Sequence, residues 1–161
     1  MDMTKNVCDL ELKVRDYECD MDHVVNHAVY LNYLEHARHE FLSGLGIKFG
    51  ELSKRGVSLV VTRIEADFKA SLISGDAFFV RTSFSRKGRV RLQFSQSIYR
   101  MPDNRLMLNA VVTGTALNAR GRPEVPLELD LLLGRWESDT ARTPADTGAA
   151  GTKKDPSESG L

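Results

Sequence analysis

The sequence predicts an α+β domain in which one antiparallel sheet wraps around one long helix. Two observations carry this prediction. Apolar residues recur at helical spacing over residues 26–46, and the spacing changes to strict alternation from about residue 60 to residue 112. A helix this apolar has to be covered, and the alternating segments are the part of the chain large enough to cover it.

The composition is that of one globular domain. The chain has 161 residues, and its 22 Lys and Arg balance its 22 Asp and Glu, so overall charge favours neither nucleic acid nor a membrane as partner. No apolar run approaches the roughly 18 residues that span a bilayer. The start of the chain has no signal-peptide pattern. Two cysteines are too few for a disulfide framework, which predicts free thiols in a reducing compartment such as the cytoplasm.

The first half of the chain reads as a strand followed by helices. Residues 10–14 alternate between apolar and charged side chains and predict a half-buried strand, which the polar residues 16–23 end. Asn26 has the chemistry of a helix N-cap, and glycines at 44 and 46 supply the stop. Residues 49–54 form a short amphipathic piece. The long helix carries its apolar residues in one wide stripe: Tyr30, Leu34, Ala37, Phe41 and Leu45.

The second half reads as strands and a tail. Alternating segments at 60–69, 78–84, 90–98 and 106–112 are separated by turn residues, and the last three predict an antiparallel meander. A sheet of this kind leaves an edge open, which favours a homodimer or homotetramer built by edge pairing. A final apolar segment covers residues 125–133. We assign residues 1–135 to the domain and expect residues 136–161 to be disordered, because they have almost nothing to bury.

Residues 16–30 concentrate reactive side chains just before the long helix. A helix start favours developing negative charge because its first N–H groups are unpaired. From the residues alone, Asp20 is as readily an ordinary loop carboxylate as a catalytic one. A thiol nucleophile at Cys19 is disfavoured because acids on both sides raise a thiol pKa. A metal site among these residues is an alternative, but we predict no metal and no cofactor. The reactive groups are Glu18, Cys19, Asp20, Asp22, His23 and His27.

This stretch also resembles a known family. The pattern Asp20-x-x-His-Val-Val-Asn-His-Ala-x-Tyr30, continued by Leu31-x-Tyr33-x-Glu35-x-Ala-Arg38, is similar to the signature of the 4-hydroxybenzoyl-CoA thioesterase-like acyl thioesterases, which have the hotdog fold. Val14-Arg-Asp-Tyr-Glu18 and Arg38-His-Glu-Phe-Leu42 resemble the plant-type acyl-lipid (acyl-ACP) thioesterases more closely still, which implies the plastid stroma as the alternative compartment if the chain is a processed plant or algal protein. The resemblance covers about residues 8 to 130. It departs from the family pattern at Glu18, where Asp is usual, and at His23, where Gly is usual.

The resemblance implies a thioester hydrolase. Asp20 matches the family's catalytic carboxylate, which would act as nucleophile or as general base on water. The backbone N–H of His27 matches the oxyanion donor, and Asn26 would fix it as the helix cap. The implied substrate is a fatty acyl chain on acyl carrier protein, lying in an apolar tunnel beside the helix. The alternatives are an acyl-CoA, including an aromatic acyl-CoA, and a non-catalytic acyl-binding module of the same fold.

Further contacts with the substrate are predicted around this site. His23 and Tyr30 lie next to the catalytic positions in sequence, although a surface histidine and a core tyrosine are the plainer interpretations. Arg89 and Arg91 belong to a cationic turn that would meet the phosphates of CoA or the acidic face of the carrier protein, although such a turn is often only a solvated edge. Glu35 and Arg38 stand three apart on the helix and are expected to pair.

Overall fold

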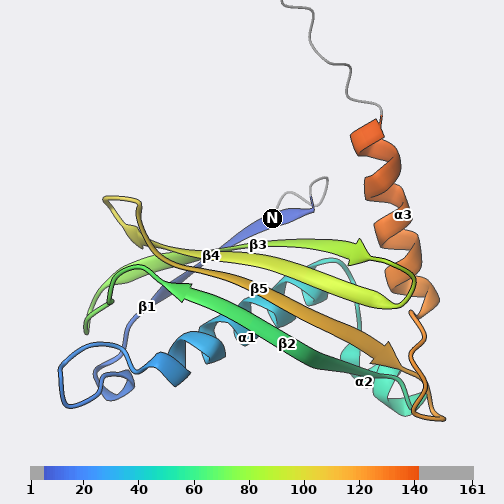
Figure 1. Cartoon of the computed structure of the whole chain (residues 1–161), viewed down its shortest axis with the longest axis horizontal. Coiled ribbons are helices and arrows are strands. Elements are labelled where there is room, and N and C mark those ends of the chain that lie inside the picture. Colours follow the sequence, from blue (N-terminus) through green and yellow to red (C-terminus); the bar gives the residue numbers. More distant parts are fainter. Residues whose placement is uncertain (1–5, 142–161) are drawn as a thin grey trace, which may run out of the picture.

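The structure, a computed structural model, describes residues 6–141, with side chains as far as Trp136. It is a five-stranded antiparallel sheet with one long helix against one face (Figure 1). The strand order is β1-β3-β4-β5-β2. No helix among residues 6–141 is long and apolar enough to cross a membrane. The elements are β1 (Val7–Lys13), the 3-10 helix η1 (Asp16–Glu18), α1 (His27–Gly44), α2 (Phe49–Lys54), β2 (Ser58–Phe68), β3 (Ala77–Lys87), β4 (Arg91–Met101), β5 (Arg105–Leu117) and α3 (Leu127–Ala141).

The predicted α+β arrangement is confirmed, with the long helix, the short helix α2 and the antiparallel meander β3-β4-β5 in their expected places. Helix α1 begins at His27 because Asn26 caps it, and Gly46 takes a φ of 85° just after its end. The apolar stripe of α1 turns toward the sheet, so Tyr30, Leu34, Ala37 and Phe41 are buried, whereas Leu45 follows the end of the helix and is half-buried.

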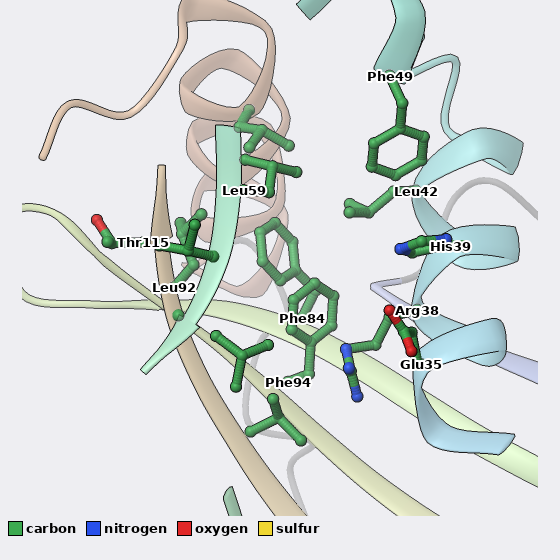
Figure 2. A pocket seen from close by; sticks show the side chains of 15 residues that line it. Glu35, Arg38, His39, Leu42, Phe49, Leu59, Phe84, Leu92, Phe94 and Thr115 are labelled. Carbon is green, nitrogen blue, oxygen red and sulfur yellow. The ribbon is translucent and has the colours of Figure 1, made fainter. Parts of the chain in front are cut away.

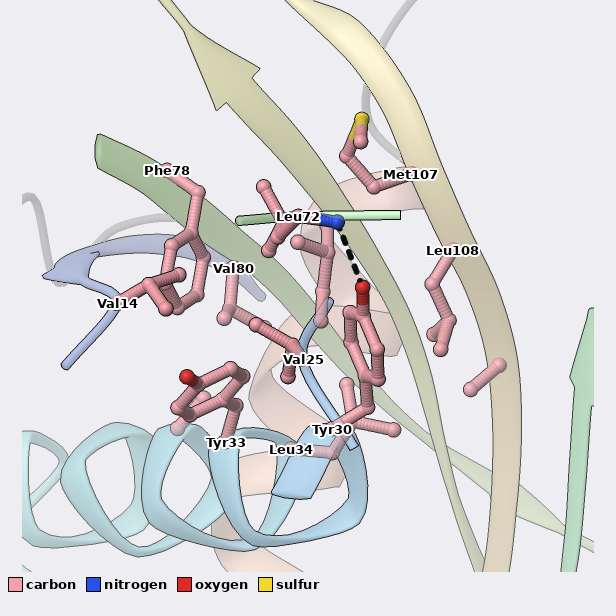
Figure 3. Close-up of a cluster of buried hydrophobic side chains, with 13 residues drawn as sticks. Val14, Val25, Tyr30, Tyr33, Leu34, Leu72, Phe78, Val80, Met107 and Leu108 are labelled. Atoms are coloured by element: carbon pink, nitrogen blue, oxygen red, sulfur yellow. Dashed lines mark hydrogen bonds between the residues drawn. The ribbon is translucent and has the colours of Figure 1, made fainter. Parts of the chain in front are cut away.

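Two buried clusters fill the space between α1 and the sheet. The first packs the early turns of α1 against the middle of the sheet and contains Tyr30, Tyr33, Leu34 and Phe78 (Figure 3). The second packs the late turns of α1 against the ends of β3 and β4 and against α3. Burial of each large side chain contributes roughly 1.5–3 kcal/mol to stability. The second cluster consists of Phe41, Leu42, Ile47, Leu52, Phe84, Leu92, Leu129, Leu133 and Trp136.

The predicted domain boundary at residue 135 falls inside α3. Trp136 is 8% exposed, and its ring centroid lies 6.2 Å from that of Phe41 and 6.3 Å from that of Phe84. The apolar residues 125–133 therefore continue as an amphipathic helix that covers one end of the core. Residues 142–161 lie outside the described residues, so the disorder predicted for them stays a prediction.

Strand β2 departs from simple alternation. Strict alternation over residues 60–69 would put Val60 and Ile64 on one face, but the pairing with β5 shifts register between Val61 and Arg63. Ile64 is opposite Val112 and Val61 is opposite Gly114, so Val61 rather than Val60 shares the face of Ile64. A bulge of one residue explains the error, because it exchanges the two faces of the strand beyond it.

Candidate active site

Asp20 stands at the head of a tight turn directly before α1. The backbone N–H of Asp20 donates to Val24 O at 2.9 Å, and that of His23 donates to Asp20 O at 3.0 Å. Cys19 and Val25 form an isolated bridge that closes the turn. His23 has a φ of 60°, the left-handed conformation that favours glycine. This conformation explains why the family pattern has Gly where this chain has His23.

The Asp20 side chain is half-buried and only partly engaged. Its Oδ1 accepts from the backbone N–H of Asp22 at 2.9 Å, a local bond that fixes the carboxylate orientation. Within the described part of the chain, Oδ2 accepts no hydrogen bond. Asp20 therefore presents one free carboxylate oxygen beside the helix start.

The first turn of α1 leaves a backbone donor free. The Asn26 side chain accepts from the N–H of Ala28 at 2.9 Å, and its carbonyl accepts from Val29 at 2.9 Å. The N–H of His27 donates no hydrogen bond to any residue between 6 and 141. A free N–H at the positive end of a helix is suited to bind an oxyanion. The predicted cap is confirmed, and the predicted donor position carries an unused donor.

A buried carboxylate that was not predicted as a site residue supports this turn. Glu18 is 8% exposed and accepts from the Tyr33 hydroxyl at 2.6 Å and from the Arg15 backbone N–H at 2.8 Å. The carbonyl of Glu18 also accepts from the Asn26 N–H at 3.0 Å. Burial and the adjacent Glu18 carboxylate raise the pKa of Tyr33. The signal in the sequence was the family pattern itself, in which Glu18 and Tyr33 both take part.

The side chains near Asp20 divide into exposed and core groups. The rings of His23 and His27 are exposed beside the turn, where a substrate can reach them. Tyr30 is 3% exposed, and its hydroxyl accepts from the backbone N–H of Leu72 at 2.9 Å (Figure 3). The structure thus gives Tyr30 the position of a core residue rather than the substrate contact predicted for it. Cys19 is a half-buried free thiol, and residues 6–141 contain no group of three His, Cys, Asp or Glu placed to hold a metal.

The cationic turn does not join the site within one chain. Arg89 and Arg91 are exposed at the β3–β4 turn, whereas the Asp20 turn follows β1 at the opposite end of β3, where Lys13 pairs with Ala77. The 11 residues of β3 separate the two regions by roughly 35 Å. The sequence could not show this, because it does not reveal that β1 pairs with β3 or in which direction the two strands run. A shared site for these arginines and Asp20 is therefore not formed within one protomer.

A pocket of about 100 Å³ lies farther along α1 (Figure 2). It opens between the later turns of α1, the start of β2, the sheet and α3. Its lining is apolar apart from Glu35, Arg38, His39 and Thr115. The other lining residues are Leu42, Phe49, Leu59, Val60, Val61, Phe84, Leu92, Phe94, Val112, Gly114 and Leu129.

The predicted ion pair between Glu35 and Arg38 is wrong. Arg38 is 8% exposed and turns inward, where its Nη1 donates to Gln96 Oε1 at 2.9 Å. Glu35 stays exposed, and no ion pair joins the two within residues 6–141. Helical spacing identified them as neighbours, but it could not show an acceptor on a strand 58 residues away.

Comparison with known proteins agrees with this architecture. A family model described as the thioesterase-like superfamily matches residues 14–147. The chain is 40% identical over 130 residues to the chloroplastic acyl-acyl carrier protein thioesterase ATL2 of Arabidopsis thaliana, covering 80% of this chain and 69% of that protein. It is 39% identical over 115 residues to ATL3 of the same plant, covering 71% of this chain and 60% of that protein.

A solved structure shows the same fold at low identity. The 1,4-dihydroxy-2-naphthoyl-CoA thioesterase from Synechocystis superposes with a TM-score of 0.75 at 17% identity, covering 80% of this chain and 96% of that one. At this identity the likeness concerns the fold alone. The family match, the plant relatives and the shared fold lead to one conclusion: the chain belongs to the thioesterase-like superfamily and has its hotdog fold.

Proposed function

We propose that this protein hydrolyses fatty acyl thioesters of acyl carrier protein to the free acid and the carrier thiol. The observation that carries the proposal is the Asp20 carboxylate, with one free oxygen, directly before a helix whose His27 N–H has no hydrogen-bond partner within residues 6–141. A carboxylate and an oxyanion donor are the two groups that a thioester carbonyl requires.

In the proposed reaction the carbonyl carbon is attacked while negative charge develops on the carbonyl oxygen. The thioester oxygen would accept from the His27 N–H, and the helix dipole favours the negative charge that develops there. In other enzymes one such donor lowers the barrier by about 3 kcal/mol. Asp20 would either attack the carbonyl carbon, forming a mixed anhydride and releasing the thiolate, or take a proton from an attacking water and pass it to the thiolate.

The two roles of Asp20 leave different isotope patterns. One turnover in H₂¹⁸O places ¹⁸O in the released acid if Asp20 is a general base. If Asp20 is the nucleophile and water attacks the anhydride at the aspartyl carbon, the label remains in the Asp20 side chain, where mass spectrometry of the peptide detects it. Attack at the acyl carbon places the label in the acid instead, so label in the peptide is diagnostic of the nucleophile.

The carrier-protein substrate rests on the plant relatives, which are named as acyl-acyl carrier protein thioesterases. A relative in Escherichia coli, 24% identical over 121 residues, is named as a long-chain acyl-CoA thioesterase, and it keeps acyl-CoA as the second candidate. Both substrates present a pantetheine thioester, so the same catalytic groups would serve either.

The decisive experiment measures free thiol released from acyl-carrier and acyl-CoA substrates. Asp20→Asn should reduce kcat by at least about a hundredfold, as expected when a catalytic acid–base group is lost. Asp22→Asn is the matched control, because Asp22 is exposed in the same turn and contributes only its backbone N–H to Asp20. Equal turnover by wild type and Asp20→Asn would overturn the mechanism. Absence of turnover with every thioester would favour a non-catalytic acyl-binding module.

The proposed enzyme is a homo-oligomer joined along β2. This strand pairs with β5 and lies at the edge of the sheet. Its side chains facing α1 are half-exposed: Val61 is 50% exposed, Ile64 40% and Phe68 51%. An apolar edge strand of this length is a template for pairing with a second copy.

A further inference from the structure

Arg38 is a buried, charged side chain in a pocket whose lining is mostly apolar. It reaches from α1 toward Phe84 and Phe94 (Figure 2). Its guanidinium carbon lies 6.0 Å from the centre of the Phe94 ring, a contact that stabilises a cation weakly. Burial lowers the pKa of Arg38, and the nearby Glu35 carboxylate opposes that shift. Arginine nevertheless stays charged at neutral pH.

The guanidinium is held in place through one of its five N–H groups. Gln96 accepts from Arg38 Nη1 at 2.9 Å, while its own amide nitrogen donates to Leu34 O and to Thr82 Oγ1, each at 3.0 Å. Because the Gln96 amide nitrogen donates to both of these oxygens, the Gln96 amide oxygen has to face Arg38. Among residues 6–141 no other acceptor bonds the Arg38 side chain. Gln96 therefore orients Arg38 and leaves its other donors for the pocket.

The position of Arg38 defines a length along the helix. It stands 11 residues after His27, counted as 38 minus 27, which is roughly 16 Å along α1. An extended chain advances roughly 1.2 Å per bond, so about 13 bonds separate the oxyanion donor from Arg38. Glu35 lines the pocket, and Leu31 lies one turn before it on the same side of α1. Leu31 and Ile64 of β2 are both half-exposed apolar side chains. An acyl chain laid along α1 from His27 would pass Leu31 before it reaches the pocket.

The chemistry at the end of this path separates two kinds of acyl chain. The pocket, of about 100 Å³, has room for water, which can solvate the other donors of Arg38. A methyl end would displace those waters without replacing their hydrogen bonds, which lowers affinity. An oxygen at the chain end would replace them with a charge-assisted hydrogen bond.

We infer that Arg38 is a specificity-determining residue that favours acyl chains carrying an oxygen, as a hydroxyl, carbonyl or carboxyl group, at their far end. This inference rests on the proposed function, because it places the acyl chain of the proposed substrate along α1, with its far end in the pocket. The roles of Asp20 and His27 stay as proposed above. The inference concerns only which acyl chain the enzyme prefers.

Matched substrates test the inference. The kcat/KM of the wild type is measured with dodecanoyl-CoA and ω-hydroxydodecanoyl-CoA, and with the corresponding pairs two carbons shorter and longer. One hydrogen bond to a charged group corresponds to a preference of about ten- to hundredfold for the hydroxylated member of the best pair. Arg38→Met, which keeps the length and removes the charge, should reduce that ratio to one or below. A ratio that is equal in the wild type and in Arg38→Met, or a wild-type ratio of one or below in every pair, would overturn the inference.

A binding experiment covers the case in which Arg38→Met does not fold. Calorimetry of the wild type with S-dodecyl-CoA and S-(12-hydroxydodecyl)-CoA, and with the corresponding pairs two carbons shorter and longer, needs neither a variant nor turnover, because these thioethers cannot be hydrolysed. Tighter binding of the hydroxylated thioether in the best pair supports the inference, and equal or weaker binding in every pair rejects it. The two proposals fail separately: absence of turnover with every thioester concerns the proposed function, whereas the ratio within a pair, or the relative affinity of the two thioethers, concerns Arg38.

Discussion

The Tyr33 hydroxyl donates a 2.6 Å hydrogen bond to the buried carboxylate of Glu18, and this bond ties the loop that carries Asp20 to the long helix. Glu18 ends the 3-10 helix before the loop, and Tyr33 lies in the second turn of α1. The same Glu18 residue bonds the N-cap Asn26 through its backbone carbonyl. The position of the helix start relative to Asp20 therefore depends on the Glu18–Tyr33 pair.

We expect Tyr33→Phe to lower the free energy of unfolding by about 2 kcal/mol, because it removes a hydrogen bond to a buried charged group. Tyr17→Phe is the control, since Tyr17 is 78% exposed. Denaturant titration of both variants measures the difference. Equal stability of the two variants would show that the Glu18–Tyr33 bond contributes nothing measurable.

The same residue predicts a loss of stability in alkali. Burial and Glu18 raise the pKa of Tyr33 above 10.0. Above about pH 10 the unfolded chain therefore releases this proton while the folded chain retains it, so stability is full below that pH and falls as the pH rises. Tyr33→Phe should flatten the fall. Part of the fall in stability should remain in this variant, because burial also raises the pKa of Tyr30. Thermal melts from pH 8 to pH 11 measure the slope.

The sequence predicted those features that repeat along the chain. The period of α1, the cap at Asn26 and the alternation of the meander are local signals, and the structure confirms all three. The sequence did not predict features that depend on one residue or on contacts between distant segments. The bulge next to Arg63 leaves no trace in composition. The bond from Arg38 to Gln96 joins elements 58 residues apart, and no spacing rule reaches that far.

The role of Asn26 separates helix capping from charge at the oxyanion. Asn26→Ala should lower stability by about 1 kcal/mol and reduce kcat, because the first turn loses the bond that fixes it. Asn26→Asp keeps a helix cap and should therefore keep the stability. It places a negative charge beside the developing oxyanion, so it should reduce kcat by a larger factor than it raises KM. Asn26→Ser is the neutral capping control. Full kcat in Asn26→Asp would argue against an oxyanion at this helix start.

His23 tests whether backbone strain or the imidazole ring matters in the turn. At a φ of 60° glycine avoids a cost of about 1 kcal/mol, so His23→Gly should not lower stability and is expected to raise it. His23→Ala keeps the strain and removes the ring. If the ring contacts substrate, both variants lose activity equally, whereas a role for strain alone affects only His23→Gly. Denaturant titration and thiol release together distinguish the outcomes.

Trp136 tests whether α3 belongs to the domain core. Trp136→Ala removes a buried aromatic side chain from the cluster around Phe41 and Phe84 and should lower the free energy of unfolding by about 3–5 kcal/mol. Leu131→Ala is the control on the same helix, because Leu131 is 61% exposed. An unchanged melting temperature in Trp136→Ala would instead support the domain boundary at residue 135 that the composition predicted.

Strand β2 tests how two copies of the chain join. In a twofold pairing along β2 each substitution occurs twice, so Ile64→Lys would bring two buried positive charges to one interface and should convert the oligomer to monomers. Leu127→Lys, at a residue that is 67% exposed on α3, controls for the added charge. Light scattering after size-exclusion chromatography measures the mass of each protein. If Ile64→Lys has the same mass as the wild type, β2 is not the edge that joins the copies. The same conclusion follows if the wild type is already monomeric and active.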